Sequence, residues 1–222
     1  MNKFLRRVIW LIMLIPAIYL AIIWNHIPEK VPMHFDIKGN VDKYGSKHDL
    51  LILILVLTVV NAIVYLVISN IYKIDPRKSA SLNKDRMRRM AVAVSIYLSA
   101  IWIMVIYEAV HNDASLTLKF VFVAMGLLFA LLGNNMYNIQ PNYFAGIRLP
   151  WTLESEDNWR KTHHVAGRLW FFGGLFFAML ALLLNKDVAG FVIIALVIIL
   201  VLIPVIYSYN LYRKSKAVKN EK

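Results

Sequence analysis

The chain has 222 residues, of which 59% are hydrophobic and 17% are charged. Soluble domains are typically about 45–50% apolar and about 25% charged, so this composition excludes a disordered chain and argues against a soluble globular domain. Lys and Arg number 25 against 13 Asp and Glu, which gives a net charge of +12. A nucleic-acid-binding protein would also be basic, but its charges would not stand between apolar runs of membrane length. We therefore expect an integral membrane protein that binds no nucleic acid directly.

Six apolar runs are long enough to cross a bilayer, which takes about 20 mostly apolar residues. Their central parts contain no Asp, Glu, Lys or Arg, and they lack the alternation of outer-membrane strands. Because a backbone in lipid must satisfy its own hydrogen bonds, we predict an all-α integral membrane protein with six transmembrane helices. The runs are approximately Phe4–Trp24, Leu50–Tyr72, Met90–Tyr107, Leu118–Met136, Leu169–Leu184 and Val188–Tyr209.

The basic residues are distributed unevenly between the two sides that six crossings define. The termini and the loops after the second and fourth runs hold 19 of the 25 Lys and Arg, with Arg168 counted there, whereas the other side holds 6. Basic loops stay in the cytoplasm, so both termini are predicted to be cytoplasmic. The same residues predict attraction to anionic membrane lipid.

The first predicted outer loop, residues 25–49, has more pattern than a simple connection. Apolar and polar residues alternate from Met33 to Lys38, which is strand periodicity. Gly39 and Asn40 form a turn dipeptide, and Val41 begins a second extended piece. We predict a short extended hairpin-like segment at the outer membrane surface.

Three side chains of this outer loop are of metal-ligating type: His34, Asp36 and Asp42. One His and two Asp without regular ligand spacing are a weak metal pattern, so a turn that also forms a partner or ligand surface is favoured. The chain has no cysteine, which excludes disulfides and thiolate zinc sites. We expect no metal and no cofactor.

The predicted inner loop, residues 134–165, is too long to be a mere connection. Ser155 is a suitable N-cap, and the two acidic residues after it suit a first helical turn. Trp159, His163 and Trp170 recur at helical spacing. We therefore predict a helix that begins near Glu156 and continues into the fifth crossing.

Arg148 stands between Gly146 and Pro150, in a stiff and turn-prone segment of this loop. Such a segment can hold the guanidinium toward a carboxylate, a phosphate or helix-end carbonyl groups. The alternative is that Arg148 contacts lipid phosphate or fastens the loop beneath the helices. Trp151 and Trp159 are of the type that anchors a chain at the membrane interface.

Catalysis is not expected from this sequence. Ser155 and His163 would lie about 12 Å apart along a helix, beyond hydrogen-bond reach. HExxH, GxSxG and P-loop sequences are all absent. A transporter of small molecules or lipids is the alternative function, although coupled transport usually places ionisable groups at mid-membrane. The small residues Gly173, Gly174 and Ala178 favour close helix packing instead.

Two stretches of the inner loop, NYFAGIRLPWTL at 142–153 and WRKTH at 159–163, resemble the signature of the SdpI family of bacterial membrane proteins. The outer stretch from Val31 to Asp42 resembles the extracytoplasmic module that often precedes this signature. The resemblance covers approximately residues 15–60 and 115–200. The chain departs from the family pattern at Leu149, where the pattern has Thr, and at His164, where it has Arg.

The resemblance implies a multi-pass protein of the bacterial cytoplasmic membrane that gives immunity to a secreted hydrophobic peptide toxin. It also implies signalling, in which the protein senses the toxin and holds a cytoplasmic repressor at the membrane. The outer-loop positions that it implies are His34, Asp36, Gly39 and Asp42. The inner-loop positions that it implies are Asn142, Gly146, Arg148, Pro150, Trp151, Thr152, Trp159, Thr162 and His163.

The chain is predicted to divide into four parts. Residues 1–72 form the first two spans with the outer loop module (25–49), and residues 73–117 form a basic inner loop with the third span. Residues 118–209 form the SdpI-like region with the inner motif loop (134–165), and residues 210–222 form a basic cytoplasmic tail. The basic segment Lys73–Arg89 is a further candidate surface for an acidic partner or for lipid.

Overall fold

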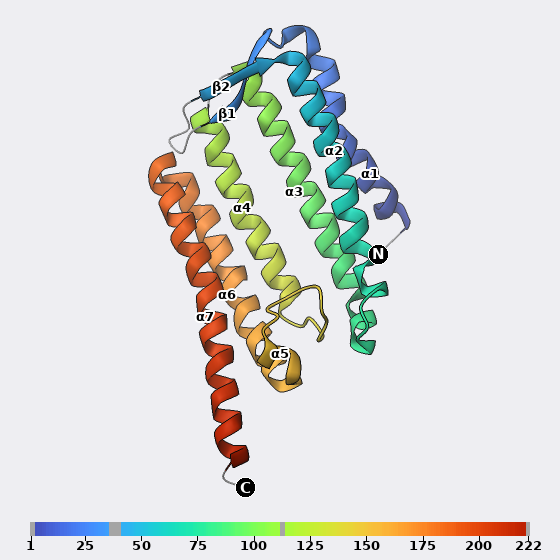
Figure 1. Cartoon of the computed structure of the whole chain (residues 1–222). Coiled ribbons are helices and arrows are strands. Elements are labelled where there is room, and N and C mark those ends of the chain that lie inside the picture. The colour runs from blue at the N-terminus through green and yellow to red at the C-terminus, as the bar shows by residue number, and fades with distance from the viewer. Residues whose placement is uncertain (1–2, 36–40, 112–113, 221–222) are drawn as a thin grey trace.

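The computed structural model describes residues 3–35, 41–111 and 114–220. Six helices in these ranges are long and apolar enough to cross a membrane, and each of the six predicted runs falls on one of them. They extend in broadly the same direction, with α1 to α3 on one side and α4, α6 and α7 on the other (Figure 1). The six are α1 (Lys3–Ile23), α2 (Lys47–Asn70), α3 (Lys84–His111), α4 (Ala114–Met136), α6 (Glu156–Leu183) and α7 (Lys186–Asn220).

Two of these helices extend well beyond the apolar runs. α6 begins at Glu156, and the Ser155 hydroxyl oxygen accepts a hydrogen bond from the Asn158 N–H at 3.2 Å, which confirms the predicted helix start and cap. α7 continues past Tyr209 to Asn220, so most of the predicted basic tail is helical. Lys, Arg and Ala are good helix formers, which is why the helix need not end with its apolar run.

The loops after α2 and α4 lie at one end of the molecule together with both chain ends, and the strands lie at the opposite end (Figure 1). We call these the loop end and the strand end. At the loop end the chain forms the short helices η2 (Ile71–Lys73), η3 (Lys78–Asn83) and α5 (Pro150–Glu154). At the strand end, η1 (Trp24–His26) follows α1. The outer loop and the inner loop therefore occupy opposite ends of one helical bundle.

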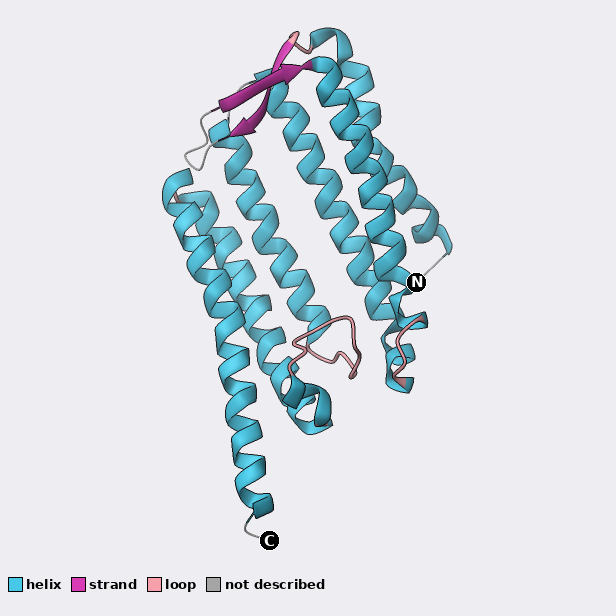
Figure 2. Ribbon diagram, viewed as in Figure 1, coloured by secondary structure: helices cyan, strands magenta, loops and turns pink. Residues whose placement is uncertain are grey.

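Two short strands pair at the strand end, drawn as magenta arrows in Figure 2. β1 (Lys30–Phe35) and β2 (Val41–Ser46) are antiparallel, with Val31 opposite Gly45 and irregular register farther along. The connecting residues 36–40, with the predicted turn at Gly39 and Asn40, lie outside the described residues. β2 leads directly into α2, because Ser46 and Asp49 form a capping box at the helix start.

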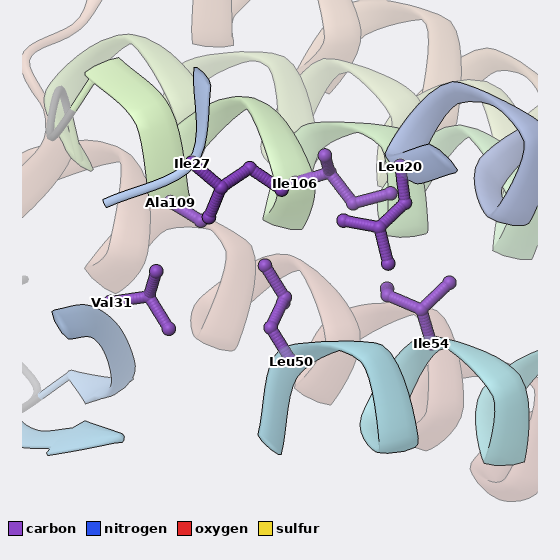
Figure 3. Packing of buried hydrophobic residues seen from close by; sticks show 7 residues of the cluster. All are labelled: Leu20, Ile27, Val31, Leu50, Ile54, Ile106 and Ala109. Atoms are coloured by element: carbon purple, nitrogen blue, oxygen red, sulfur yellow. The ribbon is translucent and has the colours of Figure 1, made fainter. Parts of the chain in front are cut away.

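An apolar cluster fixes the strand pair to the helices (Figure 3). Val31 of β1 is fully buried, and so are Leu50 and Ile54 of α2 and Ile106 of α3. The strand pair therefore packs against the helices and shares an apolar core with them. The side chains labelled in Figure 3 are Leu20, Ile27, Val31, Leu50, Ile54, Ile106 and Ala109.

α4 and α6 approach each other closely because small residues face one another along their contact. Gly126 of α4 lies against Gly174 and Ala178 of α6, and a Cβ on Gly126 would come within 2.7 Å of the Gly174 carbonyl oxygen. The predicted small-residue face is thus confirmed for Gly174 and Ala178. Gly173 faces α7 instead of α4, and a Cβ there would lie 3.1 Å from Leu200 Cδ2, so it also allows close helix packing.

Candidate functional site

The inner loop passes over α6 by a turn at Gly146. Its φ of 106° lies in the left-handed region, which glycine adopts without the strain that a Cβ brings. A Cβ at this position would also collide with Nε2 of the His163 imidazole. The close approach lets the Ile147 N–H donate to that same Nε2 at 2.9 Å. Both the backbone and the neighbour therefore require glycine here.

His163 of α6 is fully buried beneath this turn. Its Nδ1 lies 2.8 Å from the Trp159 carbonyl oxygen, which can only accept, so Nδ1 carries the proton. Nε2 accepts from Ile147, and the imidazole is thus held as a neutral tautomer with both nitrogens used. The Trp159 ring stacks on it at 4.1 Å between centroids and donates its indole N–H to the Ile139 carbonyl oxygen at 2.8 Å. This pair fastens the start and the middle of the loop to α6.

Asn142 and Thr152 shape the loop from within. The Asn142 side-chain oxygen accepts hydrogen bonds from the N–H groups of Phe144 and Ala145 at 2.9 and 2.7 Å. The Thr152 hydroxyl oxygen accepts from the Leu149 N–H at 2.9 Å, just before α5 begins. Both side chains are buried, so their polar atoms serve the backbone of the loop and do not face a ligand.

A second set of contacts connects the loop and α6 to α7. The Thr162 hydroxyl donates to the Asn158 side-chain oxygen at 2.9 Å, and the Asn158 amide donates to the Ser208 carbonyl oxygen at 3.0 Å. The Trp151 indole N–H donates to the Ser208 hydroxyl at 3.0 Å, and its ring meets Tyr209 edge-on. Trp151 thus packs on this chain's own α7.

The remaining predicted inner-loop residues, Arg148 and Pro150, are exposed. Arg148 Nη1 donates to the Tyr143 carbonyl oxygen at 2.6 Å, so this described bond goes to the loop itself and not to a carboxylate. Pro150 begins α5, where its missing N–H costs no helix hydrogen bond. Tyr143 and Phe144, which precede Arg148 in the same loop, are 43% and 38% exposed. We call Tyr143, Phe144, Arg148 and Pro150 the exposed loop surface.

The basic segment after α2 contacts the inner loop. The sequence predicted this segment as a surface for an acidic partner or lipid and did not indicate the contact. Arg77 Nη2 donates to the Leu153 carbonyl oxygen at 2.6 Å, and its guanidinium lies 4.7 Å from the centre of the Tyr143 ring. The Asp75 carboxylate accepts from the Tyr143 N–H at 2.7 Å and from the Arg77 N–H at 2.9 Å. Asp75 and Arg77 therefore hold the loop from the side of α2.

The end of η3 and the first turns of α3 add to this contact. The Asn83 side chain exchanges two hydrogen bonds of 2.9 Å with the Gln140 backbone, in the manner of a strand pair. Arg86 and Arg89 donate to the carbonyl and the side chain of Asn135 at 3.3 and 3.4 Å. Sequence reasoning missed these partners because 46 to 76 residues separate them along the chain and no periodicity relates them.

Replacing Arg77 with Gln is expected to loosen the inner loop. Hydrogen bonds to charged groups contribute about 1.5–3 kcal/mol, and this change removes one together with the contact on the Tyr143 ring. Backbone amides of residues 139–154 should then exchange about 30-fold faster with solvent, because 1.4 kcal/mol is a factor of ten. Hydrogen exchange of the detergent-solubilised protein measures this. Arg213→Gln, an exposed change in α7, is the control, and equal exchange in both variants would contradict the role of Arg77.

The loop end also contains a pocket of 550 Å³ between the end of α4 and the start of α6. Tyr137 and His164 stack on one side of it with centroids 4.3 Å apart, and Asp157 pairs with Arg160 at 3.0 Å on another. His164 is one of the two departures from the family pattern, and it also contacts the Asn138 side chain at 3.1 Å. The departure is therefore accommodated by stacking and a hydrogen bond.

At the strand end, the predicted outer residues are only partly described. His34 Nδ1 lies 2.6 Å from the Asp42 carboxylate, and both side chains are largely exposed. Asp36 and Gly39 lie outside the described residues. Within the described ranges, no group of three or more metal-ligating side chains is placed to hold a metal ion. Lys47 pairs with Glu29 at 2.6 Å, and its hydrogen bond holds the pKa of Glu29 below the usual value.

Comparisons with known proteins give two family-model matches and one similar protein. Residues 138–208 match the model of the SdpI/YfhL protein family, and residues 11–67 match a domain of unknown function, DUF1648. The chain is 26% identical over 194 residues to "Immunity protein SdpI" of Bacillus subtilis (strain 168), which covers 87% of this chain and 88% of that protein. No solved structure matches.

The family match includes most of the inner loop together with α5, α6 and the apolar part of α7. The second match covers most of α1, the strand pair and α2 up to Val67, which is the half that carries the outer loop. α3 and α4 lie between the two matched ranges, and all six long helices of the described residues are apolar enough to cross a membrane. The chain is a multi-pass membrane protein that is similar to the SdpI/YfhL family over residues 138–208.

Proposed function

We propose that this protein gives its cell immunity to a secreted, membrane-active peptide toxin and that it takes part in signalling through a cytoplasmic repressor. The observation that carries the immunity proposal is the similarity to an immunity protein over 87% of the chain. No chemical step belongs to this function, and the protein acts by binding.

We propose that the loop end faces the cytoplasm and the strand end faces outward. The uneven count of basic residues supports this orientation, since the loop end collects 19 of the 25 Lys and Arg. The outer module around His34, Asp36, Gly39 and Asp42 is then the first part of the chain that a toxin arriving from outside meets. A hydrophobic peptide that entered the bilayer would also meet the exposed apolar side chains of the helices.

The proposed contact for the repressor is the exposed loop surface. Tyr and Arg are among the residues that contribute most to protein interfaces, and here both are presented on a loop that buried side chains hold in shape. The other inner-loop positions support this surface from below. Asn142, Gly146, Thr152, Trp159, Thr162 and His163 thus act as its scaffold, and Trp151 joins it to α7.

Continuous packing between the two ends supports a signalling role. β1 shares a core with α2 and α3, and the segments that follow α2 and begin α3 hold the inner loop through Arg77 and Asn83. A toxin that binds two arrangements of the strand end unequally would therefore shift the inner loop as well.

Survival of a toxin-sensitive bacterium tests the proposal. Cells that express the protein should survive a secreted pore-forming peptide better than cells with an empty vector. If the inner surface takes part, Arg148→Ala should lose this protection at equal expression, whereas the exposed control Arg213→Ala should keep it. Unchanged survival against every such peptide tested would remove the immunity proposal.

A further inference from the structure

A second pocket, of 390 Å³, lies at the loop end between α1, α2 and α3. It is separate from the inner loop, and of its lining residues only Arg88 belongs to a predicted surface, the basic segment Lys73–Arg89. Its lining residues lie near the loop-end termini of three helices that are long and apolar enough to cross a membrane, a position that suits the level of lipid headgroups. Its lining consists of Arg7, Trp10, Tyr65, Leu66, Ser69, Asn70 and Arg88.

The charge of this pocket is entirely positive. Arg7 comes from the start of α1 and Arg88 from the first turns of α3, and the lining contains no carboxylate. Two guanidinium groups from separate helices line one cavity that offers them no acidic partner, which favours an anion there. Each guanidinium can donate two parallel hydrogen bonds to phosphate oxygens, which makes arginine the residue best suited to that group.

Ser69 and Asn70 add polar groups to the pocket, and its other walls are aromatic and apolar. Trp10 meets Tyr65 edge-on with ring centroids 5.7 Å apart, and Trp10 is 42% exposed. Tyr65 is buried in a cluster with Ile9 and Met13 of α1, so this side of the pocket is rigid. Trp and Tyr prefer the level of lipid headgroups because one part of each ring system is polar and the rest is apolar.

We propose that this pocket binds the phosphate-bearing headgroup of an anionic phospholipid. The two arginines would hold the phosphate, and the Trp10–Tyr65 wall would contact the glycerol and the first methylene groups. Leu66, which is 46% exposed beside the pocket on α2, continues this apolar wall toward the acyl chains. A lipid fits this arrangement better than a free anion because the site joins cationic donors to an apolar surface that enters the bilayer.

Native mass spectrometry of the full chain with phosphatidylglycerol tests this assignment. The wild type should retain one phosphatidylglycerol molecule, and Arg7→Gln/Arg88→Gln should bind it about 30-fold more weakly, since each cation near an anionic surface contributes about 1 kcal/mol. The control Arg213→Gln/Lys214→Gln removes two exposed cations of α7 and should bind like the wild type. Arg7→Lys/Arg88→Lys keeps the charge and should lie between the two.

Three outcomes would overturn the proposal. Equal retention by the pocket variant and the α7 control would assign the lipid to general surface charge. Equal retention of phosphatidylcholine would remove the need for an anionic headgroup. Displacement of the lipid by inorganic phosphate at an equal concentration would assign the site to a free anion. The thermal unfolding midpoint of each variant in detergent shows whether the pocket variant is folded, and the Lys variant carries the test if it is not.

Discussion

Replacing Gly146 with Ala is expected to open the inner loop and to destabilise it by about 3 kcal/mol or more. The left-handed backbone costs a non-glycine residue about 1–3 kcal/mol, and overpacking a filled site costs a similar amount. The new methyl group would meet the His163 imidazole and displace the Ile147 N–H that bonds to it. Limited trypsin digestion after Arg148, with the fragments identified by mass spectrometry, reports this opening.

A double-mutant cycle separates the two causes of this effect. His163→Ala removes the imidazole that the new methyl group meets, so Gly146→Ala should cost less in that background. The cost of the left-handed backbone should remain, at about 1–3 kcal/mol. If Gly146→Ala were cleaved no faster than the wild type, the loop would tolerate a Cβ and the arrangement of Gly146 over His163 would be refuted.

The sequence was sufficient to predict the parts of the fold that depend on local pattern. The six apolar runs predict six long helices, because membrane length and backbone hydrogen bonding leave few other structures. Ser155 predicts the start of α6, because capping depends on residues within one turn. The extension of α7 to Asn220 was not predicted, since its last residues carry charge and show no apolar run.

The candidate site was predictable in its members but not in their roles. The inner-loop residues from Asn142 to His163 were identified by their resemblance to a family signature. Resemblance cannot distinguish a residue that is buried to shape a loop, such as Thr152, from an exposed one, such as Arg148. Partners such as Asp75 and Arg77 lie far away in the chain, and only the fold brings them to the loop.

The second large effect is expected where α4 and α6 touch, for Gly174→Ala. A Cβ on Gly174 would lie 2.5 Å from the Gly126 carbonyl oxygen and 2.6 Å from the Ala130 backbone nitrogen. These are backbone atoms of another helix, so the helices themselves must separate and no side chain can turn aside. Overpacking of this kind costs about 1–3 kcal/mol, and we expect the upper part of that range. Unfolding of the purified protein by increasing SDS in mixed micelles measures the loss.

Gly190→Ala is the matched control, because it makes the same chemical change inside α7. The nearest atom to a Cβ there is Phe122 Cζ at 3.9 Å, which is an ordinary contact. Alanine favours a helix over glycine by about 1 kcal/mol, so this variant should be as stable as the wild type or more stable. The two variants share the gain in helix propensity, and their difference isolates the close approach of α4 and α6. Equal stability of the Gly174→Ala and Gly190→Ala variants would mean that the backbones of α4 and α6 are not in contact. The described packing of these two helices, between which the inner loop runs, would then be wrong.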